Sequence, residues 1–188
     1  MLKKIFFLTT NEFKFKQFLS VVDLLGFNKY VFEQLKTETV EIQAENNEQV
    51  ANYSSKWAAN KFNLPIIKED VGLYIDALDG FPGPYLAQIE KQLKSVGYLK
   101  LLEKSNNRHA HWLYSVSFCQ PKQEPIVFST IQEGVIAQKA KGSGGSFTDK
   151  IFIQQNETKT IGELLAENKY QRNNEHYQKL LCYLQSHN

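Results

Sequence analysis

The most chemically informative feature of this sequence is a pair of adjacent carboxylates, Glu69 and Asp70, at the end of the apolar run at 64–67. The pair belongs to the stretch KEDVGLYIDALDGFPGPYLA, which continues into a rigid turn containing two prolines at 81–84. A carboxylate at the end of a buried strand loses its hydration, which costs several kcal/mol unless a cation or hydrogen-bond donors replace the water. The pair is therefore a candidate metal or acid–base site.

Other side chains of this sequence could also hold a metal. Glu45, together with Glu69 and Asp70, supplies the hard oxygen ligands that Mg²⁺ takes while substrate phosphates complete its shell. Isolated carboxylates are usually solvated surface groups, but the apolar strand before Glu69 argues against that reading for this pair. His109 and His111 share one strand face, yet no third ligand accompanies them, so we do not expect a zinc site there.

Two segments could bind phosphate. In TTNEFKFKQF, the amides at the start of a helix, with Lys14 and Lys16 in its first turns, could hold an anion at the positive end of the helix dipole. The simpler reading is a helix capped by Asn11 with solvated lysines. The loop KGSGGSFTDK at 141–150 either lets its backbone approach a ligand or is a flexible connection before a strand, and it matches neither the P-loop nor the dinucleotide fingerprint.

The elements that must position these residues alternate between helix and strand, which predicts a mixed α/β fold. A polar loop is expected at 41–48, and the alternation of apolar residues from His109 onward predicts a strand that forms a hairpin with the next one. Strands are expected at 3–8, 65–69, 109–118, 126–132 and 151–153, and helices from the Asn11 cap to 25, at 48–62, from Pro84 to 102 and at 162–184.

Composition limits the possible functions. The chain has 188 residues with 22 basic and 20 acidic side chains well mixed, so we expect one domain over 1–188 and no strong binding to nucleic acid. Cys119 and Cys182 have no metal or disulfide spacing, which fits a cytoplasmic location. The apolar run at 5–8 is far shorter than a signal-peptide core, and no segment approaches the length of a membrane span.

At this point the motifs resemble the inosine triphosphate pyrophosphatase family, whose members hydrolyse non-canonical purine nucleoside triphosphates such as ITP, dITP and XTP. The resemblance covers most of the chain, and its most specific part lies at 69–85. The motifs that carry it appear in the order of the family: TTN-x-x-K at 9–14, EIQAE at 41–45, the helical Lys56, EDVGLYIDALDGFPGPY at 69–85, and EGVIAQKAKGSGG at 133–145 followed by Asp149.

The resemblance implies an elongated mixed sheet flanked by helices, in two lobes with the nucleotide in a central cleft, and a homodimer. It implies that Mg²⁺ is the cofactor, that Glu45 and Asp70 serve the metal and the attacking water, and that Glu69 lies nearby. It also implies phosphate contacts from Thr9, Asn11, Lys14 and Lys56. Of these, Lys56, on the helix, is implied to be catalytic. The rigid turn at 81–84 would then shape the wall of the cleft.

The chain departs from the family where the base is read. The family's Gly-rich loop usually continues as Phe-Gly-Tyr/Trp-Asp-Pro, with the Phe stacking on the base, whereas this loop continues as SFTDK at 146–150. The family's later Lys-Asn and Ser-His-Arg correspond to ENKYQRNNEH at 167–176, with 171–173 or 173–175 in place of Ser-His-Arg. The residues expected at the base are therefore Ser146, Phe147, Asp149 and Arg172. Lys169 joins them if it is the counterpart of the family's lysine, which is otherwise missing.

The leading hypothesis is a Mg²⁺-dependent enzyme that cleaves such nucleoside triphosphates between the α- and β-phosphates, giving the monophosphate and pyrophosphate. The alternative is a catalytically weakened nucleotide-binding protein on the same fold, which the altered base-reading segments favour. Because those segments differ, the preference for ITP or XTP over the canonical purine triphosphates is expected to be blunted or redirected.

Overall fold

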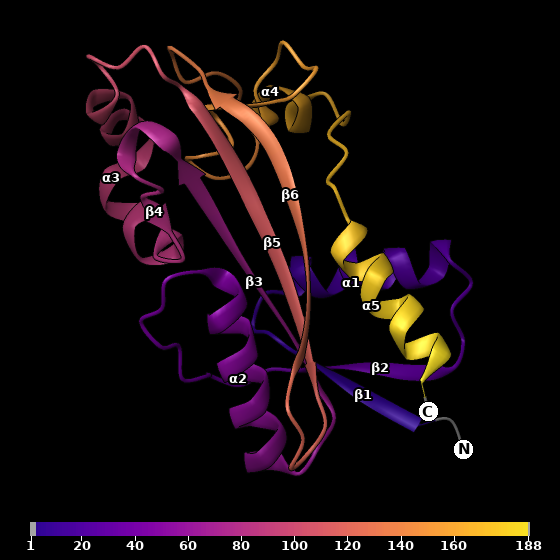
Figure 1. The fold of residues 1–188 in the computed structure, drawn as a ribbon. Helices are drawn as coiled ribbons and strands as arrows, with labels where there is room; N and C mark the ends of the chain where they lie inside the picture. The colour runs from indigo at the N-terminus through magenta and orange to yellow at the C-terminus, as the bar shows by residue number, and fades with distance from the viewer. Residues whose placement is uncertain (1–2, 188) are drawn as a thin grey trace. The chain divides into compact units, whose positions relative to one another are not determined.

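The structure is a computed structural model that describes residues 3–187. Its helices and strands are interspersed along the chain, as Figure 1 shows, and the sheet is mixed, which confirms the predicted mixed α/β class. The elements are β1 (Lys3–Leu8), α1 (Glu12–Leu24), β2 (Tyr30–Leu35), α2 (Asn47–Phe62), β3 (Ile66–Ile75), the 3₁₀ turn η1 (Asp76–Leu78), β4 (Pro82–Gly83), α3 (Leu86–Leu101), β5 (His109–Cys119), β6 (Ile126–Ile136), β7 (Phe152–Gln154), α4 (Ile161–Ala166) and α5 (Glu175–Ser186).

The strands follow the order β2-β1-β3-β5-β6-β7, with β4 paired to β3. The chain divides into two compact units, of which unit 1 comprises 1–70, 114–130 and 174–188, and unit 2 comprises 71–113 and 131–173. Strands β3, β5 and β6 each begin in one unit and end in the other. The single domain expected over 1–188 stays a prediction, as does the central cleft.

Unit 1 has apolar clusters on both faces of its strands, because successive side chains of a strand point to opposite faces. Ile67 packs in a cluster with residues of α1 and α5, whereas Ile66 packs in a second cluster with alanines of α2. Phe7 and Leu8 of β1, which pairs in parallel with β3, divide in the same way. Each face of this part of the sheet is therefore held by its own helices.

Local sequence explains where the helices begin and end. The Asn11 side chain accepts hydrogen bonds from the first turn of α1, and Asn46 does the same for α2. Helix α2 ends at Asn63, which adopts the left-handed conformation with φ 52° and ψ 45°. In α4, Thr160 and Glu163 form a capping box.

Unit 2 is built around the other ends of the long strands. The turn at 81–84 leads through β4, which pairs antiparallel with Leu73 and Tyr74 of β3, and β7 pairs antiparallel with the end of β6. The two ends of the Gly-rich loop are joined by the hydrogen bond from Lys141 N to Lys150 O at 2.9 Å, and the loop lies against the start of α4, where Gly144 N donates to Gly162 O at 3.3 Å. Gly142 and Gly145 have φ of +84° and +70°, so this loop needs glycine for its own backbone conformation.

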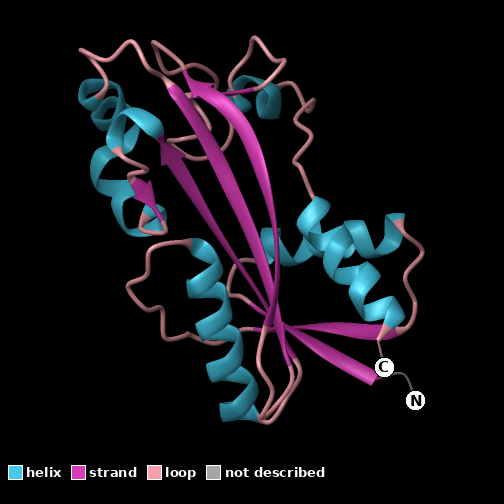
Figure 2. Ribbon diagram, viewed as in Figure 1, coloured by secondary structure: helices cyan, strands magenta, loops and turns pink. Residues whose placement is uncertain are grey.

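The predicted elements required several corrections. Strand β3 continues to Ile75, because the β-favouring residues of VGLYI extend it past the acidic pair. Helix α3 begins at Leu86 rather than Pro84, and β2 was not predicted. The single helix predicted over 162–184 is two helices, α4 and α5, and Figure 2 shows the segment between them as loop. Asparagines at 168, 173 and 174 disfavour a continuous helix there.

The two-sided packing of β3 gives the first prediction. Ile67→Ala should lower the free energy of unfolding by about 2–5 kcal/mol, because Ile67 is fully buried between α1 and α5 and its truncation leaves a cavity. Ile131→Ala is the matched control, since Ile131 is the same residue type in a strand but is 51% exposed. Urea unfolding followed by circular dichroism measures both variants, and equal losses would contradict this account of the core.

Candidate functional site

The turn between β1 and α1 is organised by its own side chains. Thr9 Oγ1 accepts a hydrogen bond from Asn11 N at 3.1 Å, and Asn11 Oδ1 accepts from Phe13 N at 2.9 Å and Lys14 N at 3.3 Å. The capping reading of Asn11 is therefore correct. It does not conflict with anion binding at the turn, because Thr9 is partly exposed and Lys14 extends from the first turn of α1.

The adjacent carboxylates Glu69 and Asp70 do not share one environment. They stand in the middle of β3, and alternation sends Glu69 to the face covered by α1 and α5 while Asp70 faces α2. Lys14 Nζ lies 3.4 Å from Glu69 Oε2, and the Glu69 side chain is fully buried. Glu69 and Asp70 therefore lie on opposite faces of β3, whereas both were expected to serve one metal ion.

A histidine that the sequence reasoning set aside lies next to Glu69. His176, near the start of α5, is fully buried, and its Nε2 lies 3.1 Å from Glu69 Oε1. Its ring stacks on Tyr114 of β5 with 5.5 Å between ring centroids. The signal that could have found it is the histidine of Ser-His-Arg, if the register is chosen so that Glu175-His176-Tyr177 takes the place of that motif.

Asp70 is the partly exposed carboxylate of the pair, and α2 supplies its neighbour. Asn47 Nδ2 donates a hydrogen bond to Asp70 Oδ2 from the first turn of that helix. Burial raises the pKa of Asp70 to about 6, against the lowering effect of Lys14, of the Asn47 hydrogen bond and of Lys68. A carboxyl group with a pKa near neutrality can accept a proton and release it again, as acid–base catalysis requires.

A second carboxylate acts on Asp70, and it is Glu41. The negative charge of Glu41 raises the pKa of Asp70, and its Oε1 accepts a hydrogen bond from Lys68 Nζ at 3.4 Å. Glu45 was expected in this role, but its side chain is exposed and only its backbone amide makes a bond, to Gln49 Oε1 at 3.1 Å, among the contacts found within 3–187. The carboxylate of EIQAE whose charge acts on Asp70 is therefore Glu41, and the metal role expected for Glu45 stays a prediction.

Among the ion pairs found within 3–187, that of Lys56 is not with Asp70 or Glu41. Lys56 forms an ion pair with Glu124, with Nζ 2.6 Å from Oε1. At 3.6 residues per turn, Lys56 lies about half a turn around the helix from Asn47, the residue that contacts Asp70. Ser54, two positions earlier, is buried and donates to Val40 O at 3.1 Å.

Three of the residues expected at the base, Ser146, Phe147 and Asp149, form one turn in unit 2. Asp149 Oδ2 accepts a hydrogen bond from Ser146 N at 2.7 Å, and burial raises the pKa of Asp149. Glu90 of α3 anchors the same turn, because its Oε1 accepts from Thr148 N at 2.9 Å and from Thr148 Oγ1 at 2.7 Å. The Phe147 ring is 36% exposed, so it is available for stacking on a ligand.

Lys169 and Arg172, also expected at the base, and the strand residue His109 all interact with carboxylates of unit 2. Lys169 is exposed and pairs with Glu167, with 3.2 Å between Nζ and Oε2. Arg172 is half-buried, and its charge lowers the pKa of Asp149. His109 lies between two carboxylates, with 2.8 Å from Nδ1 to Asp76 Oδ2.

A metal fits the Asp70 side of β3. Asp70 and Glu41 are hard oxygen donors whose charges act on one another, and Mg²⁺ commonly takes only one or two protein carboxylates while phosphates and water complete its shell. Over residues 3–187, no group of three His, Cys, Asp or Glu side chains could hold a metal ion by itself. The donor set thus suits a metal that arrives with a phosphate ligand.

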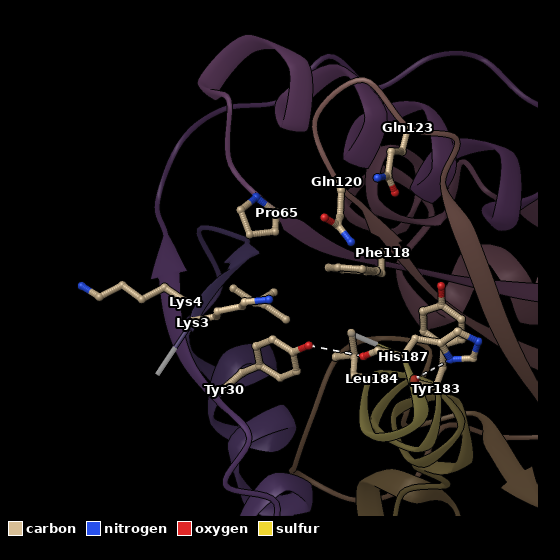
Figure 3. A pocket seen from close by; sticks show the side chains of 11 residues that line it. Lys3, Lys4, Tyr30, Pro65, Phe118, Gln120, Gln123, Tyr183, Leu184 and His187 are labelled. Atoms are coloured by element: carbon tan, nitrogen blue, oxygen red, sulfur yellow. Dashed lines mark hydrogen bonds between the residues drawn. The ribbon is translucent and has the colours of Figure 1, made fainter. Parts of the chain in front are cut away.

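A well-formed pocket elsewhere in unit 1 contains none of these residues. Figure 3 shows this pocket of about 350 Å³, in which Tyr30 Oη donates to His187 O at 3.5 Å. It is lined by Lys3, Lys4, Ile5, Tyr30, Pro65, Phe118, Gln120, Gln123, Tyr183, Leu184 and His187. The candidate site is therefore assigned from its charged groups rather than from the hollow in Figure 3.

Comparison with known proteins identifies the family. The profile of the Ham1 family matches residues 5–177. The chain belongs to the Ham1 family. The dITP/XTP pyrophosphatase of Methanosarcina acetivorans is 36% identical over 161 residues, which cover 86% of this chain and 85% of that relative. The protein of the same name from Thermococcus kodakarensis is 37% identical over 163 residues, which cover 87% of this chain and 86% of that relative. These matches confirm the resemblance seen in the motifs.

Solved structures of Ham1 proteins share the fold. The Staphylococcus aureus Ham1 protein superimposes with a TM-score of 0.78 at 26% identity, covering 97% of this chain and 98% of that one. The Coxiella burnetii HAM1 protein gives a TM-score of 0.83 at 21% identity over the full length of both chains, a likeness that concerns the fold alone. The mixed sheet described above is thus the Ham1 fold.

The raised pKa of Asp70 predicts how this residue affects stability. The folded protein disfavours the ionised carboxylate, so a penalty of up to about 3 kcal/mol is present above the folded pKa of about 6 and vanishes below the ordinary value of 3.8. Asp70→Asn removes the charge and retains a partner for Asn47. It should therefore raise the melting temperature of the metal-free protein at about pH 8 and much less at about pH 4.5.

Differential scanning calorimetry of both proteins across this pH range measures the effect. Glu12→Gln is a control, because the Glu12 carboxylate is exposed and its pKa is lowered by Lys36 rather than raised. If Asp70→Asn were less stable than the parent at about pH 8, the carboxylate would be stabilising the fold and the assignment of a strained, functional charge would fail.

Proposed function

We propose that this protein is a nucleoside triphosphate pyrophosphatase that hydrolyses non-canonical purine nucleoside triphosphates, with dITP and XTP as the substrate class. The observation that carries the proposal is Asp70, a carboxylate with a pKa near 6 that is flanked by two lysines and a second carboxylate. The relatives from Methanosarcina acetivorans and Thermococcus kodakarensis, named dITP/XTP pyrophosphatases, support the substrate class.

In the proposed reaction, water attacks the α-phosphorus, and the bond from that phosphorus to the oxygen bridging to the β-phosphorus breaks. Asp70 accepts the proton that the water loses, while Asn47 keeps its carboxylate oriented through the hydrogen bond to Oδ2. The products are the nucleoside monophosphate and pyrophosphate, which carries the electron pair of the broken bond. Mg²⁺, held by Asp70 and Glu41, would neutralise charge on the polyphosphate.

The triphosphate would be bound by the turn before α1 and its lysine. The Thr9 hydroxyl presents a hydrogen-bond donor at the positive end of α1, and Lys14 adds a cation. Asn11 acts there through its cap, because its Oδ1 accepts from the amides of Phe13 and Lys14 and so fixes the turn that carries Thr9 and Lys14. Because the charge of Lys14 already acts on Asp70, the same lysine can hold phosphate next to the base.

The remaining expectations also belong to this proposal. A homodimer is supported by an apolar hollow in unit 2, lined by Ala77, Leu78, Asp79, Phe81, Ile89, Gln92, Leu93 and Leu101. Free cysteines at 119 and 182 fit a cytoplasmic location. Within 3–187, every helix falls short of the length and apolarity that a membrane span requires.

Turnover is tested by pyrophosphate release with Mg²⁺ across dITP, XTP, ITP and the canonical triphosphates. Asp70→Asn should lower kcat by about a hundredfold or more, as expected when a general base is removed. Mg²⁺ together with a non-hydrolysable triphosphate should stabilise the parent against heat more than it stabilises Asp70→Asn. A parent that gains thermal stability from nucleotides but releases no pyrophosphate would support the alternative, a nucleotide-binding protein without turnover.

Specificity gives a second test, based on the altered loop at 146–150. Stacking on Phe147 would contribute affinity for any purine, whereas hydrogen bonds to the base edge are what separate one purine from another. We expect the ratio of kcat/KM for ITP to that for ATP to stay well below about a thousandfold, and Phe147→Ala to raise KM for both by a similar factor. A ratio of a thousandfold, or a loss in Phe147→Ala confined to ITP, would contradict this reading.

A further inference from the structure

The lysine before the acidic pair is an unusual residue for its position. Lys68 lies in β3 on the same face as Ile66 and Asp70, and it is only 8% exposed. Lysine is almost never this buried without a paired charge, because taking an ammonium group out of water costs several kcal/mol. A negative charge close to Lys68 is therefore needed to stabilise its ammonium group on the α2 face.

The counter-charge within the protein is incomplete. An ammonium group has three donors, and over residues 3–187 the hydrogen bond found for Lys68 Nζ is one long contact of 3.4 Å to Glu41 Oε1. The Glu41 side chain is 43% exposed, so this partner stands at the solvent end of the lysine. Lys68 thus retains donors for a ligand that reaches the same place.

The charges around Lys68 indicate what that ligand is. Lys68 and Lys14 both act on the Asp70 carboxylate as favourable charges, and Glu41 acts on it as an unfavourable one. If the two carboxylates take a metal, as their donor chemistry permits, Glu41 no longer balances Lys68. The group that would then satisfy the ammonium is an anion bound beside the metal.

We propose that Lys68 is a phosphate-binding residue of this site, where it donates to oxygens of the substrate's polyphosphate together with Lys14. The proposal rests on the proposed function and adds a residue to it from the α2 face of β3. Lys56 was expected to supply such a cation from helix α2, but it pairs with Glu124 instead. Lys68 supplies a cation from the strand rather than from that helix.

The alternative is a purely structural lysine whose methylene chain covers apolar surface while its head neutralises Glu41. A structural lysine would affect melting temperature when replaced but not phosphate affinity. Lys68→Met keeps the length and apolar stem of the side chain and removes the charge, and Lys68→Arg keeps the charge. Lys4→Met on the neighbouring strand β1 is the matched control, because Lys4 is exposed and its ion pair is with Glu33 at 2.7 Å.

The direct measurement is the affinity for inorganic tripolyphosphate with Mg²⁺, by isothermal titration calorimetry. Lys68→Met should bind tripolyphosphate about 10- to 100-fold more weakly than the parent, the range expected for a lost hydrogen bond to a charged group. Lys68→Arg should recover much of this loss, and Lys4→Met should match the parent. In steady-state hydrolysis of dITP, Lys68→Met should raise KM by more than it lowers kcat.

The outcomes separate this proposal from the proposed function. If Lys68→Met binds tripolyphosphate as the parent does, or if the parent does not bind it, Lys68 is not a phosphate-binding residue. If the parent binds tripolyphosphate through Lys68 but releases no pyrophosphate from any nucleotide, the proposed hydrolysis fails while the assignment of Lys68 stands. Circular dichroism spectra and melting curves of the variants show whether each affinity is measured on folded protein.

Discussion

Strand β3 sends successive side chains to opposite faces of the sheet, and the chemistry of the site depends on this alternation. It divides Ile66 from Ile67 between two apolar clusters, and two residues later it divides Asp70 from Glu69. Glu69 thereby enters a closed environment with His176 and Lys14. Asp70 is left on the α2 face, partly exposed, where a ligand can reach it.

Several weak interactions, rather than one strong ion pair, partly offset the free-energy cost of burying the ionised Asp70 carboxylate. Asn47 donates a hydrogen bond, and the charges of Lys14 and Lys68 lower its pKa, yet burial outweighs them and the pKa stays near 6. A direct, bidentate partner would stabilise the carboxylate and remove its ability to exchange a proton. Incomplete compensation is thus what holds the pKa of Asp70 near 6, at some expense in stability.

Sequence reasoning succeeded where a local pattern determines the structure, and it failed where the direction of a side chain decides. The Asn11 cap, the pairing of β5 with β6 and the burial of the apolar residues that alternate from His109 onward follow from local spacing. The opposite directions of Glu69 and Asp70 require knowing that β3 continues beyond them. The phosphate contact that the family resemblance implied for Lys56 stays a prediction, since Lys56 pairs with Glu124 and lies about half a turn around α2 from Asn47. The buried pair of Glu69 and His176 joins residues 107 positions apart, which no local pattern reveals.

The charged residues of the candidate site and the loop that departs from the family pattern belong to different units, although the motifs at 71–85 and 133–145 of unit 2 are kept. The residues that handle charge, from the α1 turn to Asp70, all belong to unit 1, whereas the altered loop with Phe147 belongs to unit 2. That loop is held by contacts within its own unit, from Glu90 to Thr148 and from Ser146 to Asp149. Because these contacts involve none of the partners of Asp70, the loop at 146–150 can change without removing the contacts around Asp70. The altered loop is therefore compatible with an unchanged arrangement of charges around Asp70.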